Sequence, residues 1–237
     1  MVHLQSENQT KVANPNHPKK GSTIKVEPIR SSKDLSAIRR IISPVYESKT
    51  FDTSRDLWTR DNIRILIALR NTALFNMGVN SAMRAVDLTK LSVGDVWSLP
   101  AGGDFEIKEQ KTRKHRIITL NRLVHKGIED YLSFRYQFDK VNKDDPLFQS
   151  FYRWKPYGLL KSNTVTEMVK SWCSAINLKG NYGSHTMRKT FGYHQHKFHG
   201  RSTADLMVIF NHRSERETLE YLCIQAEDIK KIYETVI

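Results

Sequence analysis

The stretch from residue 56 to residue 77 constrains the fold more than any other part of this 237-residue chain. Its apolar residues recur at helical spacing, with others between them: Ile63, Leu66, Ile67, Leu74 and Met77. A helix that is apolar on more than one face needs packing partners on more than one side. The pattern therefore predicts a central helix around which one main domain is built.

The surrounding patterns are mostly helical as well. Residues 121–138 and 164–176 have helical periodicity, and Thr164 with Glu167 predicts a capping box for the second of these helices. The stretch "FEIKEQKTRKHRIITL" reads as two strands joined by a basic turn. We therefore predict a mainly α fold with a small antiparallel β-sheet, an α+β class.

The chain divides into two parts by composition. Residues 1–27 are polar, contain prolines and have no sustained period, so they predict a disordered or extended N-terminal arm. Residues 28–237 form the predicted domain, and its last segment, 226–237, is an amphipathic helix with one apolar stripe.

The charge balance indicates the kind of partner. Lys and Arg number 38 against 25 Asp and Glu, a formal net charge of +13, which is typical of a protein that binds a polyanion, with nucleic acid as the first candidate. The longest apolar run, "ILIAL", is too short to span a bilayer, and no signal-peptide pattern begins the chain. Two isolated cysteines suggest neither a disulfide framework nor a zinc site. We expect a cytoplasmic protein in a reducing compartment with no membrane partner.

One segment, "SHTMRKTFGYHQHK" at 184–197, holds three histidines and no acidic residue. With Ser184 as a predicted N-cap, His185 and Arg188 would lie on one face of the first helical turn, where free N–H groups already favour an anion. A solvated basic helix end is the alternative. His194, His196 and His199 have no acidic or thiolate partner near them in sequence, so a helix facing phosphate explains them better than a metal site does.

Two further segments complete a pattern. "FNHRSERETLEYL" places His212 nine residues before Tyr221, with Ser214 as a predicted helix cap, and Arg84 follows the central helix in "GVNSAMRAVDL". With the H-x-x-R of His185 and Arg188, this ordered set resembles the tyrosine recombinase family of the phage integrase type over residues 55–223. The H-x-x-R, the 24 residues to His212 and the nine to the tyrosine are the most specific part.

The resemblance implies a site-specific recombinase or integrase that cleaves and rejoins double-stranded DNA through a 3′-phosphotyrosyl link to Tyr221, without metal, ATP or any cofactor. Arg84 and Arg188 would clamp the non-bridging phosphate oxygens, with His212 as a third donor, and His185 is the candidate base. Tyr193 and Tyr233 are rival nucleophiles outside the family's spacing, and Tyr233 lies on the apolar stripe of the last helix, where packing is its expected role.

The basic turn should supply the acid for the leaving group. Lys108, Lys111 and Lys114 are all placed there, and spacing alone does not choose between them. Lys111 fits best because "KTRKHRIITL" resembles the family's "KTGKxRxxPL" turn. Asp87, three residues after Arg84, matches the family's acidic position and is expected to orient that arginine.

The chain also departs from the family. "VNSAMR" replaces the more usual "TGLR" before Arg84, which affects the expected backbone conformation there. Most relatives have an N-terminal helical domain that closes around DNA, whereas some 50 residues precede the match here. The resemblance implies a homo-oligomer on DNA, with helix 226–237 docking into a neighbouring protomer, accessory DNA-bending proteins as further partners, and association with the nucleoid. The alternatives are a catalytically silent DNA-binding relative and a topoisomerase or telomere resolvase that uses the same chemistry.

Overall fold

The computed structural model describes residues 25–44, 59–137, 140–152, 155–224 and 233–234. In chain order its elements are α1 (Ser32–Ile42), α2 (Arg60–Asn80), α3 (Ala85–Leu88), β1 (Asp104–Lys108), β2 (His115–Thr119), α4 (Arg122–Arg135), β3 (Gln149–Tyr152), β4 (Lys155–Leu159), α5 (Ser162–Ala175), α6 (Thr186–His199), α7 (Thr203–Phe210) and α8 (Glu215–Leu222). The predicted class, mainly α with small antiparallel sheets, is confirmed. The predicted arm up to residue 24 and nearly all of the predicted helix 226–237 lie outside the described residues.

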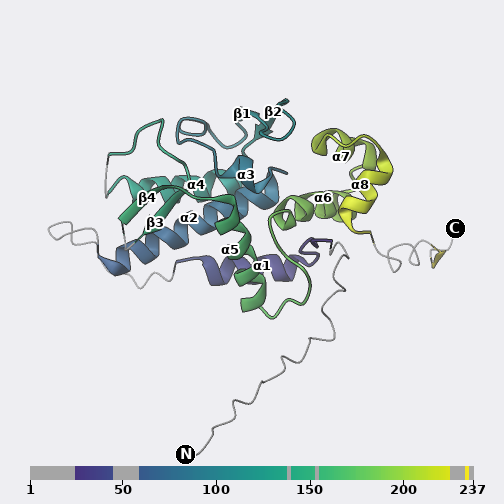
Figure 1. The fold of residues 1–237 in the computed structure, drawn as a ribbon, viewed down its shortest axis with the longest axis horizontal. Coiled ribbons are helices and arrows are strands. Elements are labelled where there is room, and N and C mark those ends of the chain that lie inside the picture. The colour runs from purple at the N-terminus through teal and green to yellow at the C-terminus, as the bar shows by residue number, and fades with distance from the viewer. Residues whose placement is uncertain (1–24, 45–58, 138–139, 153–154, 225–232, 235–237) are drawn as a thin grey trace, which may run out of the picture.

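Helix α2 is the centre of the fold, as its apolar pattern predicts. Ile63, Leu66 and Leu74 are fully buried, and α1, α4 and α6 pack against the helix from different sides. Figure 1 shows α2 running through the middle of the molecule, with α4 on one side and α1 on the other. The side chain of Thr59 caps its N-terminus by accepting a hydrogen bond from the Asn62 N–H, and the helix continues past the predicted residue 77 to Asn80.

The predicted basic hairpin is present. β1 pairs antiparallel with β2, from Asp104 opposite Thr119 to Lys108 opposite His115. A second hairpin, β3 with β4, is not predicted from the sequence, because Pro156 and Gly158 within a five-residue strand weaken the strand signal. Both sheets have only two strands, so the helices around α2 supply most of the core.

Two predicted helix starts are wrong. Helix α5 begins at Ser162, after Lys161, without a side-chain cap, so Thr164 lies inside the helix and makes no capping box. Helix α6 begins at Thr186, and the N-cap position belongs to His185, not Ser184. The turn before α6 is closed by Thr186, whose hydroxyl accepts a hydrogen bond from the Gly183 N–H, and no side chain caps the helix. The predicted cap of α8 is confirmed, since the Ser214 hydroxyl accepts from the Glu217 N–H at 3.2 Å.

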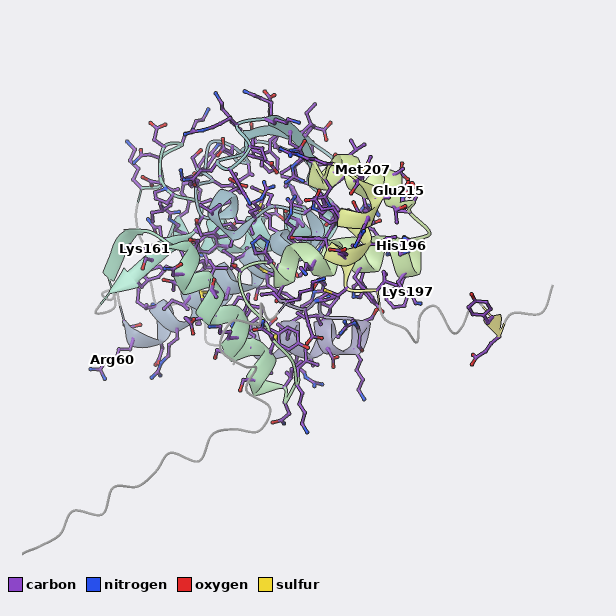
Figure 2. The ribbon with its side chains drawn as sticks, turned by 45° about the vertical axis from the view of Figure 1, so that its right-hand side comes forward. Arg60, Lys161, His196, Lys197, Met207 and Glu215 are labelled. Atoms are coloured by element: carbon purple, nitrogen blue, oxygen red, sulfur yellow. The ribbon has the colours of Figure 1, made fainter. Side chains whose placement is uncertain are left out.

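The apolar interior is divided into two clusters. The larger one draws on α1 to α6, whereas the smaller one joins α7 and α8 to the rest of the molecule through Ala82, Leu206, Phe210 and Leu222. In Figure 1 these two helices form a lobe beyond α6. In Figure 2, Met207 of α7 and Glu215 of α8 lie on the opposite side of the molecule from Arg60 and Lys161.

Gly192 explains how the α7–α8 lobe approaches α6 so closely. A Cβ atom at this position would lie 2.5 Å from the Phe210 ring and 2.7 Å from the Leu222 side chain. Any residue larger than glycine would therefore push the two helices away from α6.

Among the described helices, none combines the length and apolarity that crossing a bilayer would require.

Candidate active site

Two arginines from distant parts of the chain meet next to α6. Arg84 occupies the N-cap position of α3, and Arg188 lies on the first turn of α6. The Arg188 guanidinium is almost completely buried and donates hydrogen bonds to the carbonyl oxygens of Ala82 and, at 3.0 Å, Phe210. Because Ala82 is two residues before Arg84 and Phe210 ends α7, Arg188 joins the arginine-bearing loop to the α7–α8 lobe.

Ala82 adopts a conformation that favours glycine. Its φ is +54°, in the left-handed region, and its side chain is fully buried in the smaller apolar cluster. The residue stands where the family's "TGLR" has glycine. The backbone here is therefore left-handed although "VNSAMR" places an alanine at that position, and its carbonyl is the one that Arg188 binds.

Glu109 is a site residue that the sequence analysis missed. Its buried carboxylate lies 2.7 Å from Nη1 of Arg84, and Arg116 and Arg188 approach the same carboxylate. A signal was present in the sequence, because Phe105, Ile107 and Glu109 alternate inward along one face of the hairpin. An acidic residue that continues an inward apolar series is expected to have a buried partner.

Asp87 is a more distant partner of Arg84 than the sequence analysis expects. Its Oδ2 lies 3.9 Å from Nη1 of Arg84, whereas its Oδ1 accepts a hydrogen bond from the Gln110 N–H at 2.9 Å. Asp87 therefore ties α3 to the start of the basic turn, and Glu109 makes the closer ion pair with the arginine.

The tyrosine and the two histidines come together from α6, α8 and the loop after α7. The Tyr221 hydroxyl lies 3.2 Å from Nδ1 of His185, and the positive charge of Arg188 lies close enough to act on the Tyr221 pKa. The ring of His212 stands 5.0 Å from that of Tyr221, and its Nδ1 is 3.1 Å from the Thr218 hydroxyl. Tyr221 is thus held beside the arginines of its own chain.

The electrostatics of this group follow from burial and positive charge. Burial raises the pKa of Tyr221, and the nearby positive charge of Arg188 only partly offsets the effect. Loss of contact with water, followed by the positive charges of Arg188 and Lys189, lowers the pKa of His185. At neutral pH the site therefore holds a neutral phenol beside a neutral imidazole, whose Nδ1 can accept the phenolic proton in the tautomer that carries its hydrogen on Nε2.

The basic turn brings its lysines to the same region. Lys111 is exposed at the tip of the turn, and its positive charge lies close enough to lower the pKa of His185. Lys114 instead donates a hydrogen bond to the Asn211 side chain at 2.6 Å, which links the hairpin to the end of α7. The structure therefore favours Lys111 over Lys114 as the lysine available to a substrate.

The remaining histidines and tyrosines of interest lie elsewhere. His194 and His196 form hydrogen bonds with the backbone carbonyls of Ile29 and Arg201, and a phosphate-facing role for this part of the segment stays a prediction. His194 is six residues after Arg188, about 120° away around the axis of α6, and its side chain reaches the backbone of Ile29. Tyr193 is buried, and Tyr233 is exposed to solvent, so the packing predicted for Tyr233 is not observed. The described residues include no group of three or more His, Cys, Asp or Glu side chains arranged to hold a metal ion.

Comparison with known proteins identifies relatives of this chain. The model of the phage integrase family matches residues 59–227. A probable integrase/recombinase from Bacillus subtilis (strain 168), YoeC, is 29% identical over 164 residues, which cover 69% of this chain and 83% of that protein.

Solved structures share the fold at lower identity. The XerA recombinase superposes with a TM-score of 0.59 at 17% identity, covering 92% of this chain and 65% of that one. The XerH site-specific recombinase, bound to a palindromic difH substrate in a post-cleavage complex, gives 0.62 at 17% identity, with 91% and 54% covered. The Tn1549 transposon integrase in complex with transposon right end DNA gives 0.57 at 14% identity, with 92% and 68% covered. The chain thus spans about half to two thirds of the length of these relatives.

Proposed function

The chain belongs to the phage integrase family of tyrosine recombinases, and from this premise we propose that it is a site-specific recombinase that breaks and rejoins DNA through a covalent link to Tyr221. One observation carries the proposal. The hydroxyl of Tyr221 lies 3.2 Å from Nδ1 of His185, and the positive charge of Arg188 is close enough to act on the Tyr221 pKa, although His185 and Arg188 are 36 and 33 residues away along the chain. A phenol, a base and a guanidinium are the groups that a transesterification at phosphorus needs.

The proposed step begins with the oxygen of Tyr221. This oxygen attacks the scissile phosphorus while its proton passes to Nδ1 of His185, since a phenol with a raised pKa is a poor nucleophile until a base accepts its proton. The bond from phosphorus to the 5′ oxygen breaks, and Lys111 supplies the proton that makes the leaving group a 5′-hydroxyl. A 3′-phosphotyrosyl link remains, and reversal of the same step with another 5′-hydroxyl rejoins the strand.

The cationic groups stabilise the charge that develops on the phosphate during this step. Arg84 and Arg188 would bind the non-bridging oxygens, and His212 would add a further donor from the loop after α7. A single donor to a developing oxyanion contributes about 3 to 4 kcal/mol, so the set can lower the barrier substantially. The phosphotyrosyl link keeps the energy of the broken bond, which is why this mechanism includes no nucleotide cofactor.

Three properties of the whole protein belong to the same proposal. We propose double-stranded DNA as the partner, because the chain carries a net charge of +13 and the XerH and Tn1549 relatives are described in complexes with DNA. Assembly as a homo-oligomer on DNA and residues 28–237 as the catalytic domain are proposed on the family premise alone.

Covalent capture tests the function. The protein is incubated with suicide duplexes, in which a nick lets the cleaved fragment diffuse away, built from a randomised core so that no target sequence need be known. We expect a protein-linked strand with the wild type and none with Tyr221→Phe. Tyr193→Phe, which alters a buried tyrosine on α6, is the control and should retain the adduct. A wild type that shifts DNA with a steep salt dependence but never forms the adduct would identify a silent DNA-binding relative instead.

A further inference from the structure

The carboxylate of Glu109 lies among three guanidinium groups of the candidate active site. We infer that Glu109 is a positioning residue, which holds Arg84 and Arg188 in the arrangement that receives the phosphate and couples them to the turn that carries Lys111. The inference rests on the proposed function, because it assumes that these arginines bind the scissile phosphate.

The contacts show how tightly the carboxylate is enclosed. Its Oε2 lies 2.7 Å from Nη1 of Arg84, and its Oε1 lies 3.5 Å from Nε of Arg116 and 3.7 Å from Nη1 of Arg188. The side chain of Glu109 is only 3% exposed, and those of the three arginines are between 2% and 16% exposed. Three guanidinium groups at this spacing repel one another in the absence of DNA, and an anion between them offsets that repulsion.

The pKa shifts agree with this role. Burial lowers the pKa of Arg116 to about 10, and the positive charge of Arg188 adds to the effect, while Glu109 opposes it. Burial alone would raise the pKa of Glu109, but the ion pair with Arg84 and the hydrogen bond from Thr112 outweigh it and lower the pKa below its usual value. Glu109 is therefore ionised throughout the physiological range.

The oxygen of Glu109 that contacts Arg84, Oε2, also holds the basic turn in place. Oε2 of Glu109 accepts a hydrogen bond from the Thr112 hydroxyl at 2.8 Å in addition to its contact with Arg84. The backbone closes the turn around Lys111, since the Glu109 N–H donates to the Lys114 carbonyl and the Arg113 N–H donates to the Glu109 carbonyl. Lys111 thus belongs to a loop whose geometry is linked to the position of Arg84 through one oxygen atom.

Arg84 and Arg188 depend on Glu109 to different extents. Arg188 has two carbonyl partners of its own, in Ala82 and Phe210, and its distance to Glu109 is the longest of the three. Arg84 has Glu109 as its close partner, with Asp87 farther away at 3.9 Å, and both carboxylates approach the same nitrogen, Nη1. Loss of the negative charge at Glu109 should therefore displace Arg84 first.

A single-turnover assay on the full chain tests this dependence. The rate of adduct formation on a saturating suicide duplex is measured for the wild type, Glu109→Gln and Glu109→Asp. We expect the rate of Glu109→Gln to fall about 10- to 100-fold, because a misplacement of roughly 1 Å costs about 100-fold. The Kd for the same duplex, measured in a Tyr221→Phe background, should stay constant or decrease, because the site loses one negative charge. Glu109→Asp keeps the charge and should recover part of the rate.

Glu106→Gln is the matched control. Glu106 lies on the same strand, β1, but it is exposed and bonded to His115, so its substitution removes an equal charge without touching the arginines. Its rate and Kd should equal those of the wild type.

A double-mutant comparison separates positioning from a merely structural effect. If Glu109 acts through Arg84, Glu109→Gln should slow an Arg84→Lys protein far less than it slows the wild type. Independent, multiplicative losses would overturn the inference, as would equal rates for Glu109→Gln and the wild type. If the wild type forms no adduct, the proposed function fails and this inference fails with it, whereas an active wild type with an equally active Glu109→Gln removes this inference alone.

Thr112→Val provides a second route if Glu109→Gln does not fold. This change deletes the hydrogen bond to Oε2 and keeps every charge in place. We expect a severalfold loss of rate with an unchanged Kd, and a rate equal to that of the wild type would contradict the coupling between the turn and the arginines.

Discussion

The two halves of the candidate site are held in place by apolar clusters of different size. Arg84 and Glu109 are attached to α3 and the β1–β2 hairpin, which pack into the large apolar cluster around α2. His212 and Tyr221 are attached to the α7–α8 lobe, which meets the molecule through a smaller apolar cluster. Within the described part of the chain its buried members are Ala82, Leu206, Phe210 and Leu222. The stability of a segment follows the apolar area that it buries.

This difference has a chemical meaning. The arginines that would bind the phosphate need a fixed geometry before the DNA arrives, because stabilisation of developing charge depends on preorganised donors. The tyrosine, in contrast, becomes attached to the DNA and must then release it. A nucleophile on a lightly held lobe beside a rigid set of cations suits both requirements.

Arg188 joins the two halves, so its substitution should have the largest effect. In Arg188→Lys, one ammonium cannot replace a guanidinium that binds the carbonyls of both Ala82 and Phe210 and that, in the proposed reaction, would also bind the phosphate. We expect adduct formation to slow about 100- to 1,000-fold in a single-turnover assay, the cost of losing one well-placed oxyanion donor. Arg216→Lys, at an exposed arginine of α8, is the control, and equal losses in the two variants would refute a special role for Arg188.

Gly192→Ala tests the attachment of the lobe. The added methyl group would clash with the ring of Phe210 and the side chain of Leu222, so α7 and α8 should shift and carry Tyr221 away from His185. We expect a 10- to 100-fold slower cleavage together with faster hydrogen exchange in α8 and unchanged exchange in α2. Gly127→Ala on α4, where a methyl group makes ordinary contacts with Ala73, should alter neither quantity.

The pH dependence of cleavage tests the role of His185, which contacts Tyr221 where the two halves of the site meet. Burial and the charges of Arg188 and Lys189 lower the pKa of His185, so its neutral, proton-accepting form persists below the usual pKa of about 6.5. The cleavage rate should therefore stay level from pH 8 to about 6.5 and fall up to about tenfold per pH unit only at lower pH. His185→Gln should be slower and should lack this acidic limb; an unchanged profile in that variant would assign the base to another group.

Ala82→Gly should produce the smallest change. Glycine would remove about 1 kcal/mol of left-handed strain, but it would also remove a buried methyl group that contributes about 0.8 kcal/mol to the cluster beneath the lobe. Because the two effects oppose each other, we expect the free energy of unfolding to change by less than about 0.5 kcal/mol in denaturant titrations. A gain well above that value would show that Ala82 contributes little to the packing of α7 and α8.

The sequence predicts which helices and strands form better than it predicts the residues at which they begin. The apolar periodicity of the central helix is strong and local and predicts it, whereas the basic hairpin is predicted from two strand-like stretches that flank a basic turn. The starts of α5 and α6 were wrong, because several residues near each start can cap a helix and tertiary contacts choose among them. The hairpin of β3 and β4 was missed because its sequence contains proline and glycine.

The candidate site shows the same division. The resemblance to the family singled out Arg84, Lys111, His185, Arg188, His212 and Tyr221, and the structure brings these residues to one region, while their catalytic roles stay predictions. Glu109 escaped notice because one acid within a lysine-rich turn looks like a solvated charge until its burial is known.

The sequence by itself determined which chemical groups this protein carries, their order along the chain, and the apolar periodicity that builds α2, since these properties are local. The tertiary structure alone decided that Glu109, rather than Asp87, is the close partner of Arg84, that Ala82 takes a left-handed conformation, and that Tyr221 lies beside the arginines of its own chain. Each of these outcomes depends on side chains or segments distant in sequence, and the burial and charge that arise when they pack together cannot be read from spacing.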